Sequence, residues 1–217
     1  MIIEAVDDYE FNTIFDSLEE LTDDKIDYSI MESGAYHVWI AEETEGDVSY
    51  GTQLIRNIIQ NEDELCSIIT LQDNKSVTLK ENETGVIYVG INLNQPENEN
   101  IITRIPNSPF VEISNNQTPL YIILAHELIH ADRIMKGTFI PYENEETYVY
   151  ITKPSYEQLS QLPFSIFTIA FTNIHIRRDP EEDLITIGIL PSENVITENQ
   201  IRQEHGLRLR GGYGDEI

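Results

Sequence analysis

The feature that most constrains the fold is an apolar run at residues 118–137 that has helix signals at both ends. Thr118 is a natural N-cap, and Pro119 fits the first helical position. Apolar residues then recur at helical spacing until Gly137, which is a good C-terminal stop. The pattern predicts a helix of roughly five turns. Because most of its surface is apolar, we expect this helix to be buried.

The same helix carries His126-Glu127-Leu128-Ile129-His130, which matches the pattern H-E-x-x-H. Four residues turn a helix through about 400°, so the two imidazoles project from one side, one turn apart, and can bind one metal ion. Glu127 can reach a water molecule at such an ion and take its proton without binding the ion itself. Burying two histidines and a glutamate in an apolar helix is costly unless a metal ion is their partner. The residues therefore predict a zinc metallopeptidase, with His126 and His130 as zinc ligands and Glu127 as general base.

A third protein ligand is needed, and spacing excludes three familiar types of site. The positions that those sites would require are occupied by Lys136, Ile140 and Tyr150. The remaining candidates are Glu143, Glu145 and Glu146, and the adjacent pair could supply one ligand and one carboxylate that orients a histidine. His175, in a β-like apolar run, and His205, at a helix end, are rivals that we interpret as structural.

The rest of the chain mixes short strands with helices, which predicts an α+β fold. We expect one domain over residues 1–217, in which 1–117 form a sheet-containing N-terminal part and 118–217 carry the active site. The predicted strands are Tyr36–Ile40, Cys66–Leu71, Val77–Leu79 and Val86–Leu93; the predicted helices are Phe15–Leu21, Gly51–Ile59, one starting at Ser155 and one from Thr197 to His205; the predicted loops are Gln95–Asn100 and Asn107–Thr118.

Composition excludes several other classes of protein. The formal charge of −26 argues against nucleic-acid binding, which depends on basic residues. No stretch reaches the ~20 consecutive apolar residues of a membrane helix, and the N-terminus lacks the basic start and apolar core of a cleaved secretory signal. We therefore expect a soluble protein that is exported, if at all, without a cleaved signal. The single cysteine, Cys66, lies in a strand-like run and is expected to be a buried structural thiol.

The motif order resembles that of two groups of known metallopeptidases. Leu124 to Ala131, followed by Glu145-Glu146 and then by Thr197-Glu198-Asn199 and Arg210-Gly211-Gly212-Tyr213, is similar to the bacterial type III secretion effector metallopeptidases, which include the NleD effector. The order H-E-L-I-H, paired glutamates and R-x-x-Y also resembles the light chains of clostridial neurotoxins. The similarity covers residues 118–150 and 196–213.

This resemblance implies a zincin-like domain whose H-E-x-x-H helix is buried and packs on a small β-sheet. It implies Glu146 as the third zinc ligand and Glu145 as the supporting carboxylate. It also implies that Arg210 and Tyr213 face the Zn²⁺ ion and stabilise the oxyanion, which suits a guanidinium and a phenol as hydrogen-bond donors. A secreted effector or toxin would then act inside a target cell on a protein substrate, and kinship suggests a host signalling kinase.

Two other functions fit the same residues. The first is a zinc amidase or deacylase that acts on a non-protein amide. The second is a binding module that keeps a degenerate metallopeptidase fold, although the intact Glu127 counts against it because a binder needs no general base.

Overall fold

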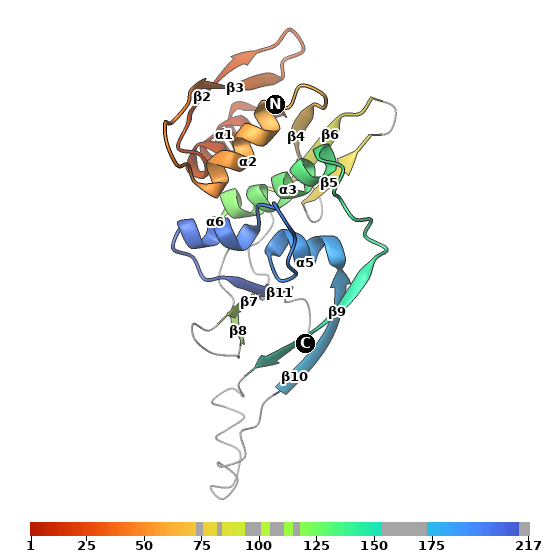
Figure 1. Cartoon of the computed structure of the whole chain (residues 1–217). Helices are drawn as coiled ribbons and strands as arrows, with labels where there is room; N and C mark the ends of the chain where they lie inside the picture. The colour runs from red at the N-terminus through yellow and green to blue at the C-terminus, as the bar shows by residue number, and fades with distance from the viewer. Residues whose placement is uncertain are drawn as a thin grey trace, which may run out of the picture.

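The computed structural model describes residues 1–72, 76–81, 84–93, 101–104, 111–114, 118–152 and 173–212. These residues form a mixed α+β fold (Figure 1). The helices are α1 (Asp8–Leu21), α2 (Tyr50–Ile59), α3 (Leu120–Met135), α5 (Glu181–Ile187) and α6 (Glu198–Glu204). The strands are β1 (Ile2–Glu4), β2 (Lys25–Ile30), β3 (Tyr36–Glu42), β4 (Cys66–Thr70), β5 (Val77–Lys80), β6 (Ile87–Ile91), β7 (Ile101–Arg104), β8 (Val111–Ser114), β9 (Glu145–Thr152), β10 (Asn173–Pro180) and β11 (Arg210–Gly212).

The N-terminal half forms a six-stranded sheet in the order β2-β3-β1-β4-β6-β5. β1, β4 and β6 are parallel, and the remaining neighbours are antiparallel. The central strands present fully buried β-branched side chains such as Ile68 and Val89. α3 packs against β5 and β6 and against α1 and α2. Figure 1 shows α3 between this N-terminal half on one side and α5 and α6 on the other.

A second sheet has the order β10-β9-β8-β7-β11. β9 and β10 pair antiparallel along their whole lengths, with Glu146 opposite Asp179. β10 runs directly into α5, and α5 and α6 both contact α3. The β9–β10 ribbon therefore returns the chain to the helix that bears the two histidines.

The ends of α3 agree with the prediction except at its first residue. Pro119 is the N-cap instead of Thr118, and no side chain caps this helix end. The Thr118 hydroxyl instead accepts a hydrogen bond from Arg202. At the other end, Gly137 has a φ of +65°, which glycine adopts without the steric cost of a Cβ atom.

Most of the predicted elements are confirmed. The helices at 15–21, 51–59 and 197–205 are present, and the last begins with the Thr197–Gln200 capping box. All four predicted strands are also present, with ends shifted by up to two residues. The loop predicted at Asn107–Thr118 is wrong over Val111–Ser114, which form β8 and pair with β7. The helix predicted to start at Ser155 lies outside the described residues.

A candidate metal centre

The two motif histidines face the same space on one side of α3. Nε2 of His126 lies 3.2 Å from Nε2 of His130, and the two ring planes are inclined by 82°. Both side chains are buried. The two imidazoles therefore project from one side of the helix, as the H-E-x-x-H spacing predicted, and one nitrogen of each ring faces the same point.

Asp183, in the first turn of α5, completes a cluster of potential ligands with these histidines. Its Oδ1 lies 3.4 Å from Nε2 of His130, and one ligand atom from each of the three residues lies within 4.8 Å of the others. Zinc–nitrogen and zinc–oxygen distances of ~2.0–2.1 Å in a tetrahedron separate neighbouring ligand atoms by ~3.3–3.4 Å. The donor types and the two short separations therefore make these three residues a possible metal-binding triad.

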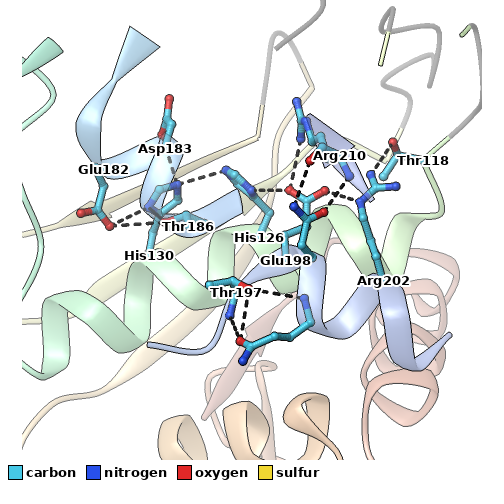
Figure 2. Close-up of polar contacts among 12 residues, drawn as sticks. Thr118, His126, His130, Glu182, Asp183, Thr186, Thr197, Glu198, Arg202 and Arg210 are labelled. Carbon is cyan, nitrogen blue, oxygen red and sulfur yellow. Dashed lines mark hydrogen bonds and ion pairs between the residues drawn. The ribbon is translucent and has the colours of Figure 1, made fainter. Parts of the chain in front are cut away.

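The other nitrogen of His126 contacts a buried carboxylate. Nδ1 lies 2.8 Å from Oε2 of Glu198, in the first turn of α6 (Figure 2). Arg202 donates to the other oxygen of Glu198, and Nη1 of Arg210 lies 3.3 Å from Oε2. Burial alone would raise the pKa of the Glu198 carboxyl, but the two guanidinium groups hold this pKa well below its ordinary value.

His130 has an equivalent arrangement on the opposite side of the cluster. Its Nδ1 lies 3.2 Å from Oε1 of Glu182, the residue before Asp183 (Figure 2). Arg133 donates to both Glu182 oxygens, at 2.5 and 2.8 Å, and the backbone N–H of Ile140 donates at 2.9 Å. Burial raises the pKa of Glu182, but hydrogen bonds from His130 and Arg133 outweigh it and lower the pKa to about 2.

These two carboxylates fix which nitrogen of each ring carries the proton. Both are ionised at neutral pH and can only accept hydrogen bonds, so Nδ1 of His126 and of His130 must donate. In the neutral form of each imidazole, Nε2 then carries the lone pair, and this lone pair is directed at the shared space. Carboxylate–histidine pairs of this kind orient metal-binding imidazoles and raise their basicity.

Glu127 lies beside the cluster and is buried. Its Oε2 lies 2.8 Å from the hydroxyl of Thr78 on β5. Burial raises the pKa of Glu127, although the neighbouring His130 and the Thr78 hydrogen bond oppose the shift. A carboxyl with a raised pKa holds a captured proton more strongly than an exposed glutamate does, as a general base requires.

The model of an effector protein family, Peptidase_M91, matches residues 43–213. The chain belongs to the Peptidase_M91 family. No curated protein and no solved structure gives a significant match. Membership in Peptidase_M91 identifies the chain as an effector protease, a hydrolase that acts on a protein substrate.

The structure of this Peptidase_M91 member places the other predicted ligand candidates elsewhere. Glu143, Glu145 and Glu146 are exposed, and the metal-ligand cluster among the described residues contains none of them. His205 caps the C-terminal end of α6, and its ring lies against Tyr121, at a centroid distance of 4.8 Å. The side chain of His175 lies outside the described residues.

Of the two residues predicted to bind an oxyanion, the structure describes one. Arg210, on β11, is buried and pairs with Glu198. Burial raises the pKa of Asp183, and the charges of His126, His130 and Arg210 oppose this rise without cancelling it. The guanidinium therefore lies within electrostatic range of the cluster. Tyr213 lies outside the described residues.

Sequence reasoning missed Asp183, Glu182 and Glu198 in this Peptidase_M91 chain. The signal for the first two was an adjacent acidic pair at the start of a helix. A ligand and a supporting carboxylate had been expected from another adjacent pair, Glu145-Glu146. The signal for Glu198 was its place directly after the N-cap Thr197, which fixes it in the first turn of α6. Neither pattern shows by itself that the side chain turns toward α3.

Proposed function

We propose that this effector protease is a zinc-dependent endopeptidase. The observation that carries the proposal is the convergence of Nε2 of His126, Nε2 of His130 and Oδ1 of Asp183 beside Glu127. These three residues would hold the ion, and in this proposal Asp183 has the role that the resemblance to known metallopeptidases implied for Glu146. A zinc site with three protein ligands keeps one position open for water or substrate, as catalytic zinc sites do.

Zinc bound there would polarise the substrate carbonyl and lower the pKa of a water molecule. Glu127 takes one proton from the attacking water while the water oxygen forms a bond to the carbonyl carbon. When the carbon–nitrogen bond breaks, Glu127 gives that proton to the leaving nitrogen. The direct products are one carboxylic acid, which loses its remaining proton to water at neutral pH, and one amine, and Glu127 returns to its ionised form.

Arg210 is the candidate for stabilising the oxyanion. It is buried at the edge of the cluster, pairs with Glu198, and carries its positive charge on a guanidinium with five N–H donors. Hydrogen bonds to developing negative charge in a site shielded from water contribute strongly to catalysis. Tyr213 is proposed as its partner because of the R-x-x-Y pattern.

The proposal extends to where the protease acts. An effector is secreted and acts in a host cell, and we propose the same for this chain. No helix in the described part of the chain has both the length and the apolar character needed to cross a bilayer. A host signalling kinase is the proposed substrate, because of the resemblance to effector metallopeptidases.

The test is to compare the unmodified protein with Glu127→Gln on a host-cell proteome and to sequence the new N-termini. The variant should keep one zinc per chain and lose at least ~100-fold in cleavage rate. Exposed Glu143→Gln is the matched control and should cleave normally. Equal cleavage by Glu127→Gln and the parent would contradict the mechanism. Absence of new termini together with hydrolysis of acetylated small amides would favour the amidase.

A further inference from the structure

Thr78 lies on β5, one of the two edge strands of the N-terminal sheet, and the proposed mechanism assigns it no step. Its side chain is fully buried. The hydroxyl oxygen lies 2.8 Å from Oε2 of Glu127 and 2.9 Å from the backbone carbonyl oxygen of the same residue. One hydroxyl on a distant strand thus contacts both the main chain and the side chain of the proposed general base.

Packing alone does not require a hydroxyl at this position. Valine has the same shape as threonine, and the cross-strand neighbour of Thr78 is the fully buried, apolar Val89. A buried hydroxyl must find a hydrogen-bond partner, and the helix carbonyl of Glu127 alone would provide one. The additional contact with Oε2 is therefore the feature that a purely structural role leaves unexplained.

The chemistry of a hydroxyl suits a group that gains and loses a proton. A hydroxyl donates to an ionised carboxylate and accepts from a protonated carboxyl, so it can contact the same oxygen in both states. While it accepts from the carboxyl, its own proton can be donated to the Glu127 carbonyl oxygen. Neither heavy atom has to move between the two states.

We propose that Thr78 is a positioning residue for Glu127. The Thr78 hydroxyl holds Oε2 of Glu127 in place and leaves Oε1 of Glu127 available to the attacking water. This inference rests on the proposed role of Glu127. It also gives the N-terminal sheet a part in the active site, because β5 packs directly against α3. The edge strand then determines the orientation of the base, while α5 and α6 determine the orientations of the histidines.

The first test measures kcat and KM on a quenched fluorescent peptide that spans a cleavage site found in the proteome assay. Thr78→Val should lower kcat about 10-fold or more and leave KM and zinc content near their original values, since a hydrogen bond to a charged group is lost. Thr78→Ser keeps the hydroxyl and should restore most of kcat. Thr78→Cys replaces the valine variant if that variant does not fold.

The matched control is Thr70, on β4 of the same sheet, whose hydroxyl donates to Oε2 of Glu10 at 2.7 Å. Thr70→Val removes the same type of hydrogen bond away from the site and should leave kcat unchanged. Unchanged kcat in Thr78→Val, or an equal loss in Thr78→Val and Thr78→Ser, would overturn the proposal.

The second test needs no substrate. The fall in Tm caused by Thr78→Val is measured in the parent and in a Glu127→Met variant, both without added metal. A clearly larger fall in the parent shows that Thr78 holds the carboxylate. Equal falls in Tm would show that Thr78 hydrogen-bonds only the backbone carbonyl oxygen, which would contradict the inference. If the parent cleaves no protein, the proposed function is wrong. The comparison of Tm values still shows whether Thr78 holds the Glu127 carboxylate.

Discussion

Oδ1 of Asp183 lies 3.4 Å from Nε2 of His130, although the two residues belong to different helices, α5 and α3. The contact forms because the β9–β10 ribbon leads away from the end of α3 and returns directly into α5. Glu182, which precedes Asp183, reaches the other nitrogen of the same imidazole. One helix start therefore supplies both a candidate ligand and the carboxylate that orients His130.

The orienting carboxylates can be tested through zinc affinity. Glu198→Gln and Glu182→Gln each keep the side-chain shape but remove the charge that holds a proton on Nδ1. Each should weaken zinc binding about 10- to 100-fold, as loss of such partners does in other sites. Competition with a fluorescent zinc chelator measures the change.

The control for this pair is Glu181→Gln, which alters the neighbouring glutamate in the first turn of α5. It should bind zinc as the parent does. Zinc affinity that is unchanged in both Glu182→Gln and Glu198→Gln would show that the buried carboxylates serve folding alone.

Cys66 should be unreactive while the protein is folded. Burial raises the pKa of its thiol to about 12, whereas an exposed cysteine has a pKa of ~8.5. Because only the thiolate reacts, alkylation by iodoacetamide at pH 8.5 should be roughly a thousandfold slower in the native protein than in urea. Mass spectrometry of the modified chain measures both rates. Similar rates in the two conditions would mean that the thiol is accessible and that β4 is not part of a closed core.

The ion pair between Asp24 and Arg56 should make stability depend on pH. Nε and Nη2 of Arg56 donate to the two Asp24 oxygens, both at 2.6 Å, and these hydrogen bonds lower the pKa of Asp24. A carboxyl with a lowered folded-state pKa stabilises the fold above its unfolded-state pKa of ~3.9, and this stability is lost as the pH falls toward the folded-state pKa.

Asp24→Asn should therefore cost about 2 kcal/mol at pH 7, a value reduced from that of a fully buried pair because Arg56 is partly exposed. Urea unfolding is measured from pH 7 to pH 3. The difference in free energy of unfolding between parent and variant should become smaller below about pH 4. Exposed Asp63→Asn is the control. A gap of constant size across this range would contradict the account.

Much of the fold could be predicted where local signals were strong. The apolar period of α3, the β-branched runs of β4 and β6 and the Thr197–Gln200 capping box each determine structure within a few residues. Val111–Ser114 were misread because the polar, proline-rich residues around them outweighed a short strand that depends on pairing with β7. β2 was missed because it is an edge strand with mostly exposed side chains. β1 was missed because only three residues form it.

The candidate site likewise contains residues that the sequence predicts and residues that it does not. His126, Glu127 and His130 follow from helix geometry, which fixes the relative directions of side chains one turn apart. Asp183 and Glu198 could not be found in this way, because their positions depend on how α5 and α6 pack on α3. Spacing along the chain indicates a ligand only when the connecting segment has a known path. Here the connection passes through a β-ribbon, and the nearer acidic pair, Glu145-Glu146, lies exposed at the start of that ribbon.

His126, His130 and Asp183 are the proposed metal ligands, and zinc titration of two matched variants tests this ligand set most directly. Asp183→Asn and Glu146→Gln each replace one carboxylate by an amide of the same shape. By competition with a chelator, Asp183→Asn should bind zinc at least ~10-fold more weakly than the parent, and Glu146→Gln should bind it equally well. Weakened binding in Glu146→Gln with parental affinity in Asp183→Asn would contradict the account.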